Sequence, residues 1–309
     1  MLMYLSILVK GLAVFVCMAL GVGFYTLLER KVLAYIQMRK GPNKVGIMGL
    51  PQPLADAAKL FTKENPKVSL ANKPLYIMSP VAAVAIMLTL WGLYISSFGI
   101  TPFKLGLLFF FAVSSLNVYT VLLSGWSSNS KYALLGAIRA VAQTISYEVS
   151  MALVIMCVLL VSFSFNLSEV FNTQNPVWFV GIIPFMAVMW FITSLAETNR
   201  APFDLAEGES ELVSGFNVEY GGGEFAFLFI AEYGSILFMS AMTACLFLGG
   251  FLTGFGLVST AKILLVAYVF LWVRGTYPRM RYDTLMSLTW KSFLSLVLVS
   301  CMILLTYWP

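Results

Sequence analysis

The carboxylates of this sequence are concentrated in one short segment. Within 15 residues it carries Glu197, Asp204, Glu207, Glu209 and Glu211, with a single cation, Arg200, among them. Like charges at this density disfavour full ionisation, so some of these groups hold protons near neutral pH and titrate as a coupled set. The segment therefore indicates storage and release of protons. A solvated acidic loop gives the same pattern and is the alternative.

Three more carboxylates extend this chemistry toward the apolar parts of the chain. Glu219 continues the acidic segment, Glu148 stands at the head of an apolar run, and Glu232 lies within one. An ionised carboxylate inside a membrane segment is unfavourable unless it is paired, hydrated or protonated, and such residues commonly belong to proton relays. A hydrogen bond that packs two helices is the alternative. Because the sequence has no histidine, a relay would use carboxylates, tyrosines, lysines and water.

Charged residues also follow the first apolar run, at Glu29, Arg30 and Arg39. Charges at the end of a membrane span are usually interfacial anchors. They would equally suit the inner rim of a cavity, to which Arg274 and Arg279 would add positive charge. Periodicity leaves the anchor and the rim as equal alternatives.

The elements that carry these residues are membrane helices. Hydrophobic residues make up 60% of the 309 residues and charged residues 11%, whereas soluble domains are about half apolar and about a quarter charged. Apolar runs of roughly 20 residues recur, each long enough to cross a hydrocarbon core of about 30 Å. They lack the alternation of barrel strands. We therefore predict an all-α integral membrane protein with a single polytopic domain, residues 1–309.

We predict about eight transmembrane helices. They occupy approximately residues 4–28, 75–97, 105–125, 145–165, 177–197, 225–249, 255–273 and 289–308. If the loops after the odd-numbered spans share one side, that side holds 16 of the 19 Lys and Arg residues, as the positive-inside rule requires. The acidic segment then lies on this inner side, and of the 14 acids only Glu169 lies in an outer loop.

The first inner loop contains an amphipathic surface helix. Its apolar stripe recurs at helical spacing at Leu54, Ala57, Ala58 and Phe61. Asp56 and Lys59 are expected to face away from that stripe. Such a helix lies in the plane of the membrane interface. It either anchors the loop to lipid or frames an opening through which a lipidic molecule enters.

Residues that usually hold cofactors are missing or scattered. The four cysteines stand alone within apolar runs, at Cys17, Cys157, Cys245 and Cys301, and no pair has zinc, haem or iron–sulfur spacing. We interpret them as packing thiols. We expect no metal and no cofactor to be bound by this chain. The segment 41–46 lacks the Gly-Lys-Ser/Thr of a phosphate loop, and the net charge of +5 reflects topology rather than nucleic-acid binding.

Several motifs resemble the family of chain 1 of proton-pumping NADH:ubiquinone oxidoreductase, respiratory complex I. They are Glu29-Arg30-Lys31, Arg39–Asn43, Asp56–Phe61, Arg139–Glu148, Ala196–Phe216 and Tyr277-Pro278-Arg279, and together they span nearly the full chain. The string from Glu197 to Glu211 is the most specific of them. The compact length and the N-terminus look like the mitochondrially encoded version, which implies the mitochondrial inner membrane with the odd-numbered loops in the matrix.

The resemblance implies a core membrane subunit that belongs to an enzyme but is not catalytic alone. It implies ubiquinone as the substrate, with FMN and iron–sulfur clusters held by partner subunits. The implied partners are quinone-site and iron–sulfur subunits of the peripheral arm, antiporter-like membrane subunits and lipids, with no nucleic acid. By motif position, the quinone chamber is bordered by Glu29, Arg30, Arg39, Asp56, Lys59, Arg200, Arg274 and Arg279. By the same reasoning, the proton pathway consists of Glu148, Glu197, Asp204, Glu207, Glu209, Glu211, Glu219 and Glu232.

Two other functions share part of this pattern. A free-standing secondary transporter also needs intramembrane acids, but inverted repeats and broken helices, which would favour it, are not evident in the sequence. The membrane subunit of hydrogenase complexes would share the acids without a quinone entrance. One departure from the resembled family is the run of three glycines before Glu224, where many members have a proline. We expect a mobile loop there and assign Glu224 no role in the pathway.

Overall fold

The computed structural model describes residues 2–66, 68–94, 103–175, 177–205, 208, 213–250 and 256–307, with the backbone alone for residues 2–8 and 307. Every regular element in these ranges is helical, so the all-α prediction is confirmed. The helices are α1 (Leu2–Ile36), α2 (Gln52–Thr62), α3 (Lys73–Trp91), α4 (Gly106–Ser127), α5 (Lys131–Ser162), α6 (Leu167–Thr173), α7 (Phe179–Ile182), α8 (Pro184–Glu197), α10 (Gly222–Phe247), α11 (Gly256–Thr276), α12 (Tyr282–Ser287) and α13 (Leu294–Tyr307). Single 3-10 turns cover Ile47–Gly49 and Gly215–Asn217, and the π-helical stretch Leu288–Phe293 joins α12 to α13.

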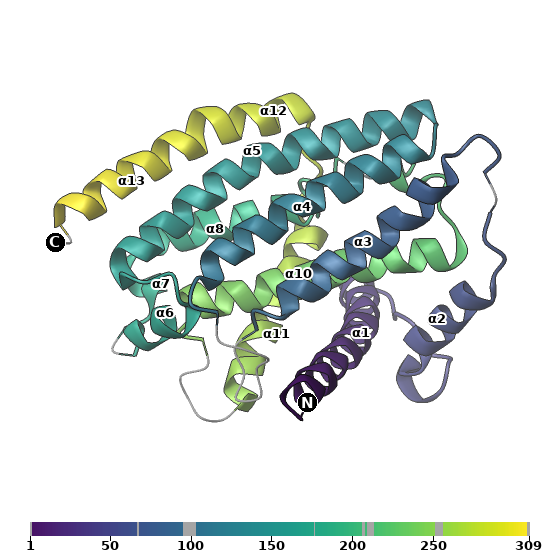
Figure 1. The fold of residues 1–309 in the computed structure, drawn as a ribbon, viewed down its shortest axis with the longest axis horizontal. Coiled ribbons are helices and arrows are strands. Elements are labelled where there is room, and N and C mark those ends of the chain that lie inside the picture. Colours follow the sequence, from purple (N-terminus) through teal and green to yellow (C-terminus); the bar gives the residue numbers. More distant parts are fainter. Residues whose placement is uncertain are drawn as a thin grey trace.

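The long helices lie side by side in one bundle. Figure 1 shows α5 between α4 and α13, with α3 next to α4, and α10 crossing beside α3 toward α1 and α2. Within the described ranges, seven helical stretches are long and apolar enough to cross a membrane: α1, α3, α4, α5, α10, α11 and Tyr282–Thr306. They match seven of the eight predicted spans.

The fifth predicted span, 177–197, is not one helix. The turn α7 ends at Ile182, Ile183 has the non-helical angles φ −128° and ψ 62°, and Pro184 begins α8. Proline has no backbone N–H and a fixed φ, so it is tolerated at the first turn of a helix and starts α8 here. The 14 residues of α8 rise about 21 Å, less than a hydrocarbon core of about 30 Å. The prediction of a continuous span over 177–197 is therefore wrong at Ile183.

Helix α5 begins well before the predicted span 145–165. Ser130 caps it by accepting a hydrogen bond from the N–H of Ala133, and the helix continues for 32 residues. Glu148 therefore lies in the interior of a helix rather than at its head, which corrects the prediction. A small residue permits close packing near the N-terminal end of α5, because a Cβ on Gly136 would lie 2.8 Å from the Cα of Gly215.

The helix α13 is held against α5 by a covalent link. Cys157 and Cys301 form a disulfide, with Cα atoms 5.5 Å apart and a separation of 144 positions in sequence. The interpretation of all four cysteines as packing thiols is wrong for this pair, because the packing of α13 on α5 brings two distant positions together. Cys17 and Cys245 are free thiols.

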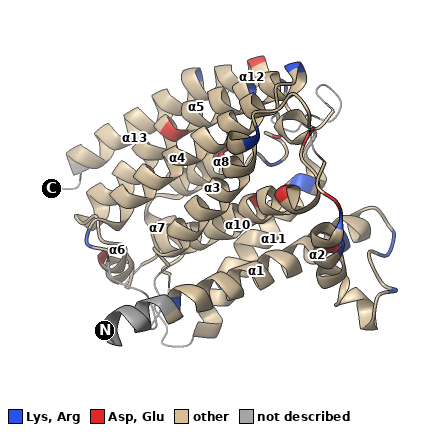
Figure 2. Cartoon of the chain, turned by 45° about the vertical axis from the view of Figure 1, so that its right-hand side comes forward, with Lys and Arg blue, Asp and Glu red and all other residues tan. Residues whose placement is uncertain are grey.

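Most charged residues gather at one end of the bundle. Figure 2 shows the Lys, Arg, Asp and Glu segments mainly near α2 and the start of α12, whereas the middle of the bundle is almost entirely uncharged. This distribution agrees with the predicted sorting of basic residues to one side of the membrane. The few acids that lie within the bundle are therefore exceptions that need a chemical reason.

Candidate functional site

A cavity of about 430 Å³ opens between α1, α2 and α10. Its walls are mostly apolar, with Val22 on α1, Leu60 on α2 and Phe229 on α10 among the lining residues. Four charged side chains also line it, namely Glu29, Arg30, Asp56 and Arg274. Ligand sites of this size typically combine apolar walls with a few placed polar groups, and this cavity has both.

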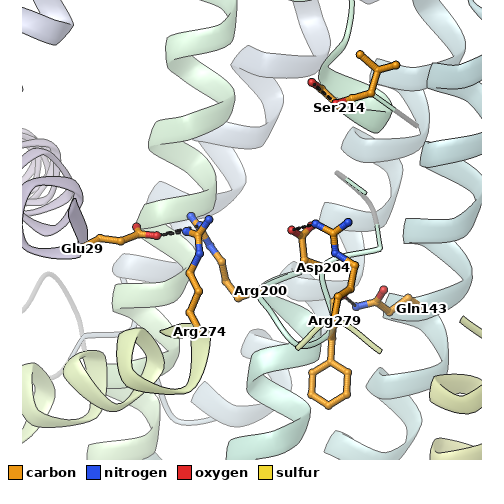
Figure 3. Close-up of polar contacts among 9 residues, drawn as sticks. Glu29, Gln143, Arg200, Asp204, Ser214, Arg274 and Arg279 are labelled. Carbon is orange, nitrogen blue, oxygen red and sulfur yellow. Dashed lines mark hydrogen bonds and ion pairs between the residues drawn. The ribbon is translucent and has the colours of Figure 1, made fainter. Parts of the chain in front are cut away.

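The charged part of the cavity is built around Glu29, which is only 4% exposed. Arg274 on α11 forms an ion pair with its carboxylate, and Nη1 of Arg200 lies 3.7 Å from the same oxygen, Oε1. Figure 3 shows the guanidinium groups of Arg200 and Arg274 side by side, opposite the carboxylate of Glu29. One buried carboxylate thus holds two cations that come from different parts of the chain.

Arg200 connects this ion cluster with the acidic segment. Its guanidinium carbon lies 4.3 Å from the centre of the Tyr233 ring, a distance at which a cation and an aromatic face attract each other. Tyr25 packs edge-on against Tyr233 and donates a hydrogen bond to the carbonyl of Ala267 on α11. Arg200 is therefore positioned by α1, α10 and α11 together.

The surface helix α2 turns both a charged residue and part of its apolar stripe toward the cavity. Asp56 lines the cavity, where its carboxylate lies 2.6 Å from Nη1 of Arg30 and accepts a hydrogen bond from Gln52. The face toward the cavity also includes Ala57, whereas Leu54 is 61% exposed. The ion pair with α1 accounts for this orientation, since an apolar stripe in contact with lipid does not fix a rotation by itself.

The start of the acidic segment is anchored from two sides. The amide nitrogen of Gln143, fully buried on α5, donates to the carbonyl oxygens of Ala196 at 3.0 Å and Phe203 at 2.8 Å. On the other side, the N–H of Met280 donates to the carbonyl of Pro202, and Arg279 pairs with Asp204 at 3.2 Å. Figure 3 shows the Asp204–Arg279 pair beside Gln143 and apart from Glu29.

We expect Gln143→Leu to loosen the loop between Glu197 and Asp204. The change keeps the side-chain size but removes the amide that bridges the carbonyls of Ala196 and Phe203, and each lost hydrogen bond costs about 0.5–1.5 kcal/mol. Limited proteolysis of the assembled complex should cleave this loop faster. Ser150→Ala, on the same helix, is the control because the Ser150 hydroxyl bonds only within its own turn. Equal cleavage of both variants would count against the anchoring role of Gln143.

Two of the intramembrane acids face a second, smaller cavity. Glu197 and Glu232 line a space of about 50 Å³ between α3, α4, α8 and α10. The Oε2 atom of Glu197 is buried and has no hydrogen-bond partner, and Glu148 on α5 is its carboxylate neighbour in electrostatic contact. The fold thus brings three predicted pathway residues, from three helices, into one region.

The remaining predicted residues are not all brought together. Arg39 is exposed and bonds to Gln37, and Lys59 is exposed on α2, so neither lines the larger cavity. The side chain of Glu219 is half-buried, and its carbonyl accepts a hydrogen bond from Tyr76. Glu207, Glu209 and Glu211 lie outside the described residues. In the described part of the chain, no group of three Cys, Asp or Glu side chains has the arrangement of a metal site.

The three glycines before Glu224 allow the start of α10 to pack closely against Asn65 and Pro66. Gly222 has φ +61°, the N–H of Gly223 donates to Oδ1 of Asn65, and a Cβ on Gly221 would lie 2.9 Å from the Pro66 ring. These glycines let α10 start directly against the segment before α3. The carboxyl group of Glu224 lies near the hydroxyl of Tyr76, which donates to the carbonyl of Glu219, and the sequence did not indicate this proximity.

The acids and arginines of the site were predicted from the sequence, but the residues that position them were not. Gln143 is one of them, because an amide in an apolar helix carries no signal of the two carbonyls it will meet. Tyr25 is another. Tyr233, whose ring faces Arg200, is a third.

Comparison with known proteins gives consistent matches over the whole chain. The family model described as NADH dehydrogenase matches residues 9–305. The chain is 54% identical over 304 residues to NADH-ubiquinone oxidoreductase chain 1 of Heterololigo bleekeri, covering 98% of this chain and 97% of that protein. It is 52% identical to the protein of the same name from Aedes aegypti over 295 residues and to that from Oryctolagus cuniculus over 300, each time covering 96% of this chain and 94% of the relative.

Proposed function

The chain belongs to the NADH dehydrogenase family, together with NADH-ubiquinone oxidoreductase chain 1, and we propose that it forms a quinone chamber and an acidic proton pathway in that enzyme. It is a multi-pass membrane subunit of respiratory complex I, in the mitochondrial membrane, and part of the oxidoreductase rather than an enzyme alone. We assign electron transfer, FMN and the iron–sulfur clusters to partner subunits.

The observation that carries the chamber is the cavity between α1, α2 and α10. Ubiquinone has a polar ring and a long isoprenoid tail, so its site needs apolar walls for the tail and polar groups toward the ring. The apolar walls and the cluster of Glu29, Arg30, Asp56 and Arg274 supply both. The amphipathic helix α2, with no buried residue of its own, supports an entrance from the lipid phase.

Arg200 is the proposed link between quinone chemistry and protons. It lies beside the chamber carboxylate Glu29 and belongs to the loop that begins at Glu197. Negative charge that arrives with quinone reduction changes the balance of this ion cluster. Because Arg200 is part of the acidic segment, the change alters which neighbouring carboxylates hold protons. Arg39, Lys59 and Arg279 are assigned to the outer border of the chamber.

The proposed pathway leads from the acidic loop into the membrane. Asp204, Glu207, Glu209, Glu211 and Glu219 form its loop part, and Glu197, Glu148 and Glu232 form its intramembrane part. The shared cavity of Glu197 and Glu232, with Glu148 in contact with Glu197, supports this order. The pathway ends toward the antiporter-like membrane subunits.

The orientation in the membrane follows from charge. The basic residues lie mostly on the side of α2 and the start of α12, and cytoplasmic or matrix loops carry the excess of Lys and Arg. We therefore assign these loops to the matrix of the mitochondrion and the short outer loops to the opposite side.

A tryptophan at Ala57 tests the chamber. Ala57 lines the cavity, so we expect Ala57→Trp to narrow it and to raise the KM for a long-tailed quinone more than for a short-tailed one. The measurement is NADH:quinone activity of the assembled enzyme with both substrates. Ala58→Trp is the matched control, because Ala58 is exposed and does not line the cavity. The same KM change in both variants would contradict the chamber.

A further inference from the structure

The cavity that Glu197 and Glu232 share is polar on several sides, although it lies within an apolar bundle. Its volume is about 50 Å³, and a cavity needs about 10–15 Å³ of such space for each water, so it has room for several. The polar residues that line it come from α4, α8, α10 and the turn after α8: Asn117, Thr120, Glu197, Thr198, Asn199, Glu232 and Ser235. Waters in this space would find hydrogen-bond partners in several directions.

Asn117 is the polar residue that α4 contributes to this cavity. The helix around it is strongly apolar, and a polar amide in such a helix is unfavourable unless it is satisfied. Thr120, one turn later, donates to Oδ1 of Asn117 at 3.1 Å. Neither N–H of the amide has a described protein acceptor, which leaves both donors for a molecule in the cavity.

A hydrogen-bond acceptor that complements the amide donors of Asn117 also lines this cavity. Oε2 of Glu197 is buried without a hydrogen-bond partner, and Glu232 lies on α10 across the same space. A carboxylate oxygen and an amide N–H around one small polar cavity are complementary partners for water. If this side of the cavity were apolar, it would hold no water, and the Glu197 oxygen would have no hydrogen-bond donor.

We propose that Asn117 is a positioning residue of the proton pathway, whose amide holds the water that connects Glu197 with Glu232. The proposal rests on the proposed function and adds a neutral group to it. The amide does not itself take up a proton. It donates to a water oxygen and so orients that water, which accepts a proton from whichever of the two acids is protonated and gives one to the carboxylate of the other.

The test uses the assembled enzyme in sealed membranes and measures protons translocated per NADH oxidised. We expect Asn117→Leu, which removes the amide at similar size, to reduce this ratio to less than about half, while NADH oxidation with a hydrophilic artificial acceptor stays unchanged. Asn117→Asp, which keeps polar atoms at the same place, should retain most of the ratio. Val121→Leu is the matched control, since it fills the same cavity and removes no polar group.

An unchanged ratio in Asn117→Leu, or an equal loss in Val121→Leu, would overturn the role of Asn117. If Asn117→Leu prevents assembly, Asn117→Val removes the same groups with less added volume and is judged by the same ratios. Glu197→Gln and Glu232→Gln, measured in parallel, distinguish a failure of the proposed pathway from a failure of the role of Asn117. Normal pumping in Glu197→Gln and Glu232→Gln would contradict the proposed pathway as a whole. A loss of pumping in these two variants but not in Asn117→Leu would keep the pathway and contradict only the role of Asn117.

Discussion

Replacing Glu29 with alanine should prevent stable assembly of this subunit. The substitution leaves Arg274 and Arg200 next to each other without their shared carboxylate, in a place where Glu29 is 4% exposed. Removing one partner of a buried ion pair destabilises a protein by about 3–5 kcal/mol, because the remaining charge stays buried and uncompensated. The measurements are the thermal unfolding temperature of the purified complex and its yield on a native gel.

Asp56→Ala is the control for this prediction. It also breaks an ion pair at the same cavity, but the side chains of Arg30 and Asp56 are 54% and 36% exposed. Exposed pairs contribute about 0–1 kcal/mol, so assembly should be close to normal. The double variant Glu29→Gln with Arg274→Met should recover part of the lost stability, since it removes carboxylate and cation together. A Glu29→Ala complex as stable as Asp56→Ala would show that the Glu29 cluster does not hold the structure.

The second large effect is expected at Glu232 and Glu148. A glutamine at either position keeps the shape of the side chain but cannot release a proton, and a positioned acid or base contributes roughly 10²–10⁴-fold to a proton transfer. We therefore expect Glu232→Gln and Glu148→Gln to abolish most proton pumping. NADH oxidation by an artificial acceptor should continue, because electron entry is assigned to partner subunits.

The readout is proton uptake into sealed membranes at a measured rate of NADH oxidation. Glu169→Gln provides the control, since Glu169 lies in the first turn of the short helix α6, at a distance in sequence from all proposed pathway residues. Undiminished pumping coupled to NADH oxidation in both Glu232→Gln and Glu148→Gln would rule out the proposed pathway. A similar loss in Glu169→Gln would indicate a general effect of lost charge instead.

The membrane class, most of the spans and the acidic segment could be predicted because they depend on local properties. A run of about 20 apolar residues needs a helix in lipid wherever it stands in the chain, and loop charges sort by side without reference to any contact. The acids and arginines were recognisable as unusual because charge inside or beside a membrane span is rare. Glu29, Glu197 and Glu232 were identified on that basis.

The pairing of these residues was decided only by the tertiary structure. Glu29 meets Arg274, which is 245 positions away, and Gln143 meets the carbonyls of Ala196 and Phe203, which lie 53 and 60 positions later. A membrane helix is apolar on the faces toward lipid and on those toward other helices, so its sequence does not reveal which face meets which neighbour. For the same reason Asn117 stood out in no pattern, the apolar stripe of α2 did not indicate which face meets the cavity, and the disulfide between Cys157 and Cys301 was not foreseen. The packing of the helices therefore decides that one group of charged residues forms a buried ion cluster at the larger cavity, and that two acids share the smaller cavity.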